Sequence, residues 1–269
     1  YPINMREMLS PNLNVPLGKT PVVLTFDDAR GTQFTYLADG SLDPDCAVAI
    51  LEEFHRQHPD WPLKASFYVL PKSKYNPTPF YQPGLEAKKL NYLVQRGFEV
   101  ANHSTSHRMM RTLNAEQLRW EMAECVRYVR QRAPGATMDT MALPGGSTPR
   151  TAELFDVLLN GTEGGTTYHN LCILRAWGDT TYPPAHKKFD IKDIKRIGAD
   201  PGYIEGWIKR LSSGEVRPYV SDGDPNMITV PKSREKYLDK SRTNGIKIVV
   251  WDDETVKPSK KKKNPKSVD

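Results

Sequence analysis

The chain contains little cysteine and no long apolar run. Its 269 residues include 3 cysteines, Cys46, Cys125 and Cys172, which are far apart in sequence and lack the spacing of a cysteine metal motif. We expect small core residues at these positions, so the cysteines leave the redox compartment open. No stretch is long and apolar enough to span a membrane. Hydrophobic residues make up 38% of the chain, which is low but still typical of a globular protein.

Positive charge is concentrated at one end of the chain. The formal net charge is +6, but six lysines lie within the C-terminal segment 257–269. The remainder is close to neutral, so we expect no nucleic-acid partner. We interpret residues 1–256 as a single domain and residues 257–269 as a basic, disordered tail. The chain starts at Tyr1 and shows no charged-then-apolar leader, so we interpret it as a processed or trimmed form whose targeting signal lies outside it.

Apolar runs and helical periods alternate over the first 160 residues. We predict strands at 21–26, 65–70, 98–101 and 140–143, and helices at 45–57, 84–96, 114–132 and 149–160. This alternation favours an α/β fold with a parallel sheet, either open or closed into a barrel. The pattern weakens after Gly161. There we predict strands at 171–176, 227–230 and 246–251 and a helix at 201–211, while 182–197 shows no clear period.

Three of the predicted helices carry end signals. Gly97 is placed to end the second helix in a left-handed conformation. Asn114, followed three residues later by Gln117, has the form of a capping box at the start of the third. Ser147 or Thr148 is the expected cap of the fourth, because Pro149 suits the first helical position.

The first predicted strand ends in two adjacent carboxylates, Asp27 and Asp28. The carboxyl ends of parallel strands are where α/β folds build their active sites. Two neighbouring carboxylates repel unless a cation, a proton or hydrogen bonds offset their charge. The pair therefore indicates a metal or a perturbed proton equilibrium.

Two histidines, His103 and His107, follow the third predicted strand at a spacing of four. Their imidazoles point the same way in a helical turn, although a surface or capping role is an alternative for such a pair taken alone. If the first and third strands are close in the sheet, Asp28 joins them in a site of two histidines and one carboxylate. Such a site suits Zn²⁺, with Co²⁺ or Ni²⁺ as alternatives, and leaves coordination positions open to water.

These two motifs resemble signatures of the polysaccharide deacetylase family, also called the NodB-homology family or carbohydrate esterase family 4. Thr25–Asp28 match its Thr-Phe-Asp-Asp signature, and His103-Ser104 with His107 match its second signature with one residue fewer between Ser and His. The resemblance covers roughly residues 19–160 and implies a distorted (β/α) barrel. It also implies Asp27 as general base, with Asp28, His103 and His107 as metal ligands.

The implied activity is metal-dependent removal of N- or O-acetyl groups from a carbohydrate polymer, often of the cell wall. The substrate is then an acetylated glycan in an extracellular, periplasmic or cell-surface location, and the oligomeric state stays open. Alternatives are a catalytically reduced or inactive glycan-binding relative that keeps the metal, and a hydrolase of another small amide.

The chain departs from the family in two further signatures. Where the family has Arg-x-Pro-Tyr, this chain has Ala142-Leu143-Pro144-Gly145, so the arginine that orients the base is missing; Arg30 and Arg175 are candidate substitutes. The Gly145 N–H remains a candidate oxyanion donor. The last apolar strand, at 246–251, is followed by aspartates and not by the family's acid histidine. His169 and His186 are candidate acids, with loop or surface roles as the alternative.

Overall fold

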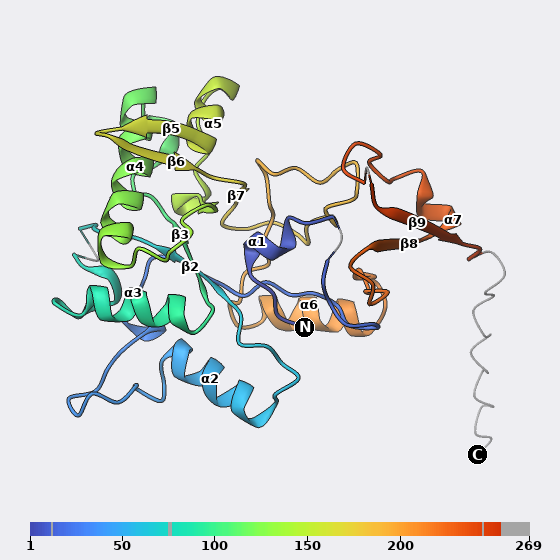
Figure 1. Cartoon of the computed structure of the whole chain (residues 1–269), viewed down its shortest axis with the longest axis horizontal. Helices are drawn as coiled ribbons and strands as arrows, with labels where there is room; N and C mark the ends of the chain where they lie inside the picture. The colour runs from blue at the N-terminus through green and yellow to red at the C-terminus, as the bar shows by residue number, and fades with distance from the viewer. Residues whose placement is uncertain (12, 75–76, 244, 254–269) are drawn as a thin grey trace, which may run out of the picture.

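The computed structural model describes residues 1–253 except 12, 75–76 and 244. Five parallel strands form its central sheet in the order β1-β2-β3-β4-β7. Figure 1 labels β2, β3 and β7 of this sheet. Their bounds are β1 Thr25–Phe26, β2 Ser66–Val69, β3 Glu99–Asn102, β4 Met141–Ala142 and β7 Ile173–Leu174. The sheet curls into part of a barrel and helices connect its strands, which confirms the predicted α/β fold of the distorted barrel type.

The connecting helices confirm the predicted helical periods. They are α2 Ala47–Gln57, α3 Glu86–Gln95, α4 Ala115–Arg132 and α5 Ala152–Leu159. Gly97 follows α3 with φ +83°, the left-handed end that was expected. The side chain of Asn114 accepts a hydrogen bond from the Gln117 amide at 2.9 Å, and the Gln117 side chain accepts one from the Asn114 amide at 3.2 Å. This reciprocal pair is the predicted capping box.

The start of α5 and the segment after it differ from the prediction. Thr151, not Ser147 or Thr148, caps α5, because residues 144–146 form a separate 3₁₀ turn and the Ser147 hydroxyl accepts from the Arg111 amide. An antiparallel hairpin of β5 (Asn160–Glu163) and β6 (Thr166–His169) then follows, which the sequence reasoning missed. The Gly164-Gly165 dipeptide, with φ of 54° and 75°, was the turn signal.

The chain beyond β7 adds elements at the side of the sheet. Helix α6 spans Tyr203–Ser212, and the parallel pair β8 (Met227–Pro231) and β9 (Lys247–Trp251) flanks the short helix α7 (Lys232–Glu235). In Figure 1 this pair lies at the opposite end of the long axis from α4 and α5. The predicted elements 201–211, 227–230 and 246–251 are confirmed. The predicted tail 257–269 lies outside the described residues.

Both faces of the central sheet are buried. Phe67 and Val69 of β2 pack into the main core with the helices, while Tyr68 packs on the other face with Met5 of the N-terminal helix α1 (Met5–Met8). Alternate residues of a strand point to opposite faces, so a sheet covered on both sides requires continuous apolar runs. Cys46, Cys125 and Cys172 are buried free thiols, as expected. Within the described part of the chain, no helix combines the length and apolar character needed to cross a membrane.

A candidate metal centre at the carboxyl edge of the sheet

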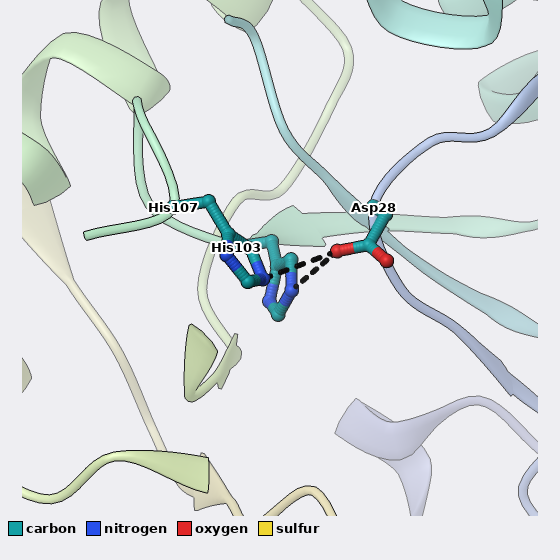
Figure 2. Close-up of side chains that lie close together, drawn as sticks. All are labelled: Asp28, His103 and His107. Carbon is teal, nitrogen blue, oxygen red and sulfur yellow. Dashed lines mark ion pairs between the residues drawn. The ribbon is translucent and has the colours of Figure 1, made fainter. Parts of the chain in front are cut away.

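Asp28, His103 and His107 converge at the carboxyl ends of β1 and β3. One carboxylate oxygen, Asp28 Oδ1, lies 3.2 Å from His103 Nε2 and 3.3 Å from His107 Nε2. Figure 2 shows this oxygen facing both imidazole rings. One potential ligand atom from each of the three residues lies within 4.8 Å of the others. The juxtaposition that was expected from strand order therefore exists, with β2 between β1 and β3.

The backbone around Asp28 adopts left-handed conformations that residues other than glycine rarely use. Asp28 has φ +73° and Ala29 has φ +49°. Neighbouring loops hold this turn: the Phe80 amide donates to the Ala29 carbonyl at 2.6 Å, and the Gln33 side chain donates to the Asp27 carbonyl at 2.5 Å. Strained backbone supported in this way is a common feature of functional sites.

The imidazole of His103 is oriented by the neighbouring strand. It is 1% exposed, and its Nδ1 lies 2.9 Å from the carbonyl oxygen of Ala142. A carbonyl oxygen only accepts, so Nδ1 carries a proton, and Nε2 is the ring nitrogen that faces Asp28. Two electron-rich atoms at 3.2 Å are stable only with a cation or a proton between them. This donor set fits a divalent metal, whose histidine ligands commonly donate their other N–H to a carbonyl.

The charges in the cluster favour an ionised Asp28. Hydrogen bonds from His103 and His107 hold the pKa of Asp28 well below its usual range, and they outweigh the effect of burial. The other oxygen, Oδ2, accepts from the Arg30 guanidinium at 3.1 and 2.9 Å. Conversely, the hydrogen bond to Asp28 raises the pKa of His107. In the absence of a metal, a proton is therefore favoured between Asp28 Oδ1 and the imidazoles, where a cation would bind.

Asp27 has a separate partner, Arg196, which the sequence reasoning did not identify. The guanidinium donates to Asp27 Oδ1 at 2.8 Å and to Oδ2 at 2.7 Å, and it also reaches Thr25 Oγ1 at 3.2 Å. The predicted substitutes are engaged elsewhere, since Arg30 pairs with Asp28 and Arg175 pairs with Asp193. The expectation that Arg30 or Arg175 pairs with Asp27 is therefore wrong.

The position of Arg196 follows from pairing at the edge of the sheet. Ile194 forms a parallel bridge with Leu174 of β7, and the Arg175 amide donates to the Ile194 carbonyl at 2.8 Å. This pairing brings the end of segment 182–197 to the carboxyl edge. The segment has no periodicity, so no local pattern could have pointed to Arg196.

Arg196 helps to keep Asp27 ionised. Burial alone would raise the pKa of the Asp27 carboxyl, but His103 and the hydrogen bonds and charge of Arg196 together bring this pKa below its ordinary value. Asp27 is therefore an anion at neutral pH, so it can accept a proton.

The family model of polysaccharide deacetylases matches residues 14–158, more than half of the chain. The chain belongs to the polysaccharide deacetylase family. The matched range contains both aspartates and both histidines but ends before Arg196. No curated protein matches the chain.

Several solved family structures resemble the chain over part of its length. The deacetylase PplD of Streptococcus pyogenes, solved with acetate, is 18% identical, covers 59% of this chain and has a TM-score of 0.44. A family 4 carbohydrate esterase of Streptomyces lividans, also with acetate, is 24% identical, covers 52% and has a TM-score of 0.33. A family 4 pseudoenzyme of Bacillus anthracis is 20% identical, covers 54% and has a TM-score of 0.35. The matches span 60%, 58% and 43% of those chains, less than two thirds of each.

Gly145 lies where the family resemblance expects the oxyanion donor. It follows β4 in the 3₁₀ turn Pro144–Gly146 with φ +55°. The next two amides are used within the turn, since Gly146 donates to Leu143 and Ser147 donates to Pro144, each at 3.0 Å. The role of the Gly145 amide stays a prediction.

The two candidate acid histidines have other described partners. His169 Nδ1 is hydrogen-bonded to Asn160 Oδ1 across the β5–β6 hairpin. His186 is stacked between Tyr182 and Tyr237, with ring centroids 4.4 and 5.5 Å away, and its Nδ1 accepts from the Lys188 amide. None of these partners belongs to the cluster of Asp28, His103 and His107, so the described contacts favour the loop and surface roles.

Proposed function

We propose that this member of the polysaccharide deacetylase family is a metal-dependent hydrolase that removes N- or O-acetyl groups from a carbohydrate polymer. The observation that carries the proposal is that a site suited to a cation, at Asp28, lies directly beside an anionic carboxylate, Asp27. Asp28 faces two histidines that suit a cation, and the adjacent Asp27 is held as an anion by Arg196. A hydrolase needs both functions within reach of one acyl group.

Asp28, His103 and His107 are the residues that would hold the metal. Two imidazole nitrogens and one carboxylate oxygen suit Zn²⁺, and Co²⁺ or Ni²⁺ are alternatives. Bound there, the cation would polarise the acetyl carbonyl and make the attacking water more acidic. In our proposal His103 keeps its orientation during the reaction because Ala142 and the surrounding core fix its ring.

Asp27 is the proposed general base. Its low pKa keeps it ready to accept a proton from the attacking water, and Arg196 fixes its carboxylate in one orientation. The Gly145 amide is the proposed donor to the developing oxyanion. Since the described partners of His169 and His186 lie outside the cluster, we assign protonation of the leaving group to the protonated form of Asp27.

We propose an acetylated glycan of the cell wall or another extracellular polymer as substrate, in an extracellular, periplasmic or cell-surface location. The rival is a glycan-binding relative that retains the metal without turnover. It is favoured by the absence of Arg from Ala142–Gly145 and of a histidine directly after β9. Arg196 weakens the first of these arguments, because a guanidinium does pair with Asp27.

The deciding experiment measures acetate release by the purified chain loaded with Zn²⁺ or Co²⁺. The substrates are chito-oligosaccharides and peptidoglycan fragments. We expect release by the wild type and a rate about 10²- to 10⁴-fold lower in Asp27→Asn, with the bound metal unchanged in the variant. Stoichiometric metal without acetate from any glycan would support the binding rival.

A further inference from the structure

The loop between the two histidines is attached to helix α4 by one buried carboxylate. Glu121 is completely buried, and its Oε2 accepts hydrogen bonds from the amides of Thr105 and Ser106, each at 2.9 Å. The Ser106 hydroxyl donates to Oε1 at 2.5 Å. In addition, the Thr105 hydroxyl donates to the Glu121 main-chain carbonyl at 2.8 Å. Four hydrogen bonds therefore join one residue of α4 to two of the three residues between the histidines.

These contacts hold a backbone that is costly to form. Ser104 has φ +64° and His107 has φ +59°, both in the left-handed region. A residue other than glycine persists in this region only where its surroundings determine the conformation. Asn102 accepts from the Ser104 amide at 2.8 Å, and the Ser104 hydroxyl accepts from the His107 amide at 3.1 Å. Glu121 secures the stretch between these two bonds.

His107 depends on the loop more than His103 does. The Ala142 carbonyl orients the His103 ring, and that ring is almost fully buried. The His107 side chain is 34% exposed, and its ring contacts Asp28 and is T-shaped with the His103 ring at a centroid distance of 5.2 Å. Its position therefore follows the backbone that carries it, and Glu121 restrains that backbone.

The burial of the Glu121 carboxyl group is also informative. In the part of the chain that the structure describes, no lysine, arginine or histidine forms an ion pair with it. A buried carboxylate without a cation is costly unless several donors satisfy it. Here the donors come from the loop itself, so the cost of burying this carboxyl group is offset only while the loop keeps this conformation.

We propose that Glu121 is a positioning residue that pre-forms the His103–His107 loop for a divalent transition-metal cation. The proposal rests on the metal site of the proposed function. Ligand support of this kind typically changes metal affinity by about 10- to 100-fold when it is removed. A purely structural role would instead lower the stability of the fold and leave the affinity of the folded protein unchanged.

The test compares Glu121→Ala, Glu121→Gln and Ser106→Ala by calorimetric titration of metal-free protein with Zn²⁺. We expect Glu121→Ala to weaken binding by roughly 10-fold or more. Glu121→Gln should recover much of the affinity, because its amide oxygen can still accept from Thr105 and Ser106. The matched control is Glu124→Gln on the same helix, whose carboxylate pairs with Arg127; it should bind as the wild type does.

Visible absorption of the Co²⁺ form gives a second readout, since it reports the ligand geometry directly. We expect an altered spectrum for Glu121→Ala and a wild-type spectrum for Glu124→Gln. If Glu121→Ala does not fold, Ser106→Ala decides, because it removes one donor and leaves the helix intact. Wild-type affinity and spectrum in both variants, with only a lower Tm, would overturn the proposal.

These measurements use no glycan, so they separate the two proposals. Normal metal affinity in the wild type without acetate release would remove the proposed function and leave the role of Glu121 in place. Acetate release by the wild type, together with unchanged metal binding in Glu121→Ala, would support the proposed function and remove the role of Glu121. A wild type that binds no divalent cation would overturn both.

Discussion

Arg196 and Asp27 are 169 residues apart in the chain, yet their side chains form a two-pronged ion pair at 2.8 and 2.7 Å. The pair places a guanidinium beside the carboxylate that the family resemblance assigns as general base. Ala142 stands where the family's Arg-x-Pro-Tyr signature has its arginine. A cation beside the base is thus present, but it comes from a different part of the chain.

Replacing Arg196 by Met should raise the pKa of Asp27 and reduce activity. Arg196 lowers that pKa, so its removal moves the acid limb of the pH–activity profile to higher pH. It also leaves a largely buried carboxylate without a partner, which we expect to reduce the free energy of unfolding by roughly 3 kcal/mol. The measurements are acetate release between pH 4 and 9 and urea unfolding.

Two further variants test whether the loss of activity in Arg196→Met comes from the lost ion pair with Asp27. Arg196→Lys keeps the charge but not the fork of two parallel hydrogen bonds, so its activity should be intermediate. Arg175→Met is the control, since the Arg175 side chain pairs with Asp193, and only its main-chain carbonyl contacts Arg196. An acid limb that stays in place in Arg196→Met would contradict the assignment.

Asp27→Asn should separate catalysis from metal binding. An amide of the same shape cannot accept the proton, so we expect acetate release to fall by about 10²- to 10⁴-fold. The Zn²⁺ content should be unchanged, because Asp27 is not among the three clustered residues. Metal analysis and an acetate assay on the same preparation check both statements. Loss of metal from this variant would mean that Asp27 is itself a ligand.

Metal should stabilise the fold through Asp28. A cation that binds only the folded state adds about 2.7 kcal/mol at a concentration of 100 times its Kd. We expect Zn²⁺ to raise the Tm of the wild type and a chelator to reverse the increase. Asp28→Asn should show little of this shift, and Asn suits the left-handed backbone at this position as well as Asp does. An equal shift in the variant would contradict the role of Asp28.

Glu99 provides a stability prediction away from the site. It is buried at the start of β3, where burial raises its pKa despite hydrogen bonds from Ser66 and Thr140. A raised pKa means that the folded state binds the proton more tightly, so this group makes the protein less stable as pH rises above about 4.5. Glu99→Gln should therefore gain on the order of 1 kcal/mol at pH 7 relative to the wild type, and the gain should shrink at pH 4.

Urea unfolding of both proteins at the two pH values measures this difference. Arg6→Met is a useful companion, because the half-exposed Arg6 side chain pairs with the largely buried Asp139 near Glu99 while the Arg6 amide still donates to Glu99. Arg6→Met should lack the gain in the free energy of unfolding that we expect for Glu99→Gln at pH 7. If Glu99→Gln has a lower free energy of unfolding than the wild type by the same amount at both pH values, shape and not charge governs this position.

Local patterns in the sequence determined most of the first half of the molecule. The helical periods gave α2, α3 and α4 to within about two residues, because each buries one apolar face. Asp27, Asp28, His103 and His107 were found because they directly follow strands of a parallel sheet, whose carboxyl ends share one edge. Such relationships depend only on neighbouring residues and on strand order.

Tertiary structure alone decided which residues support the site at the carboxyl edge of the sheet. Arg196 reaches Asp27 because segment 182–197 pairs with β7 at Ile194, a contact between irregular stretches that no residue period encodes. Glu121 looks like a polar residue within a helical period, yet it is buried against the histidine loop. The sequence by itself determined which groups could carry the chemistry. Long-range packing decided which charges stabilise them, because ion pairs and buried hydrogen bonds depend on distance in space and not along the chain.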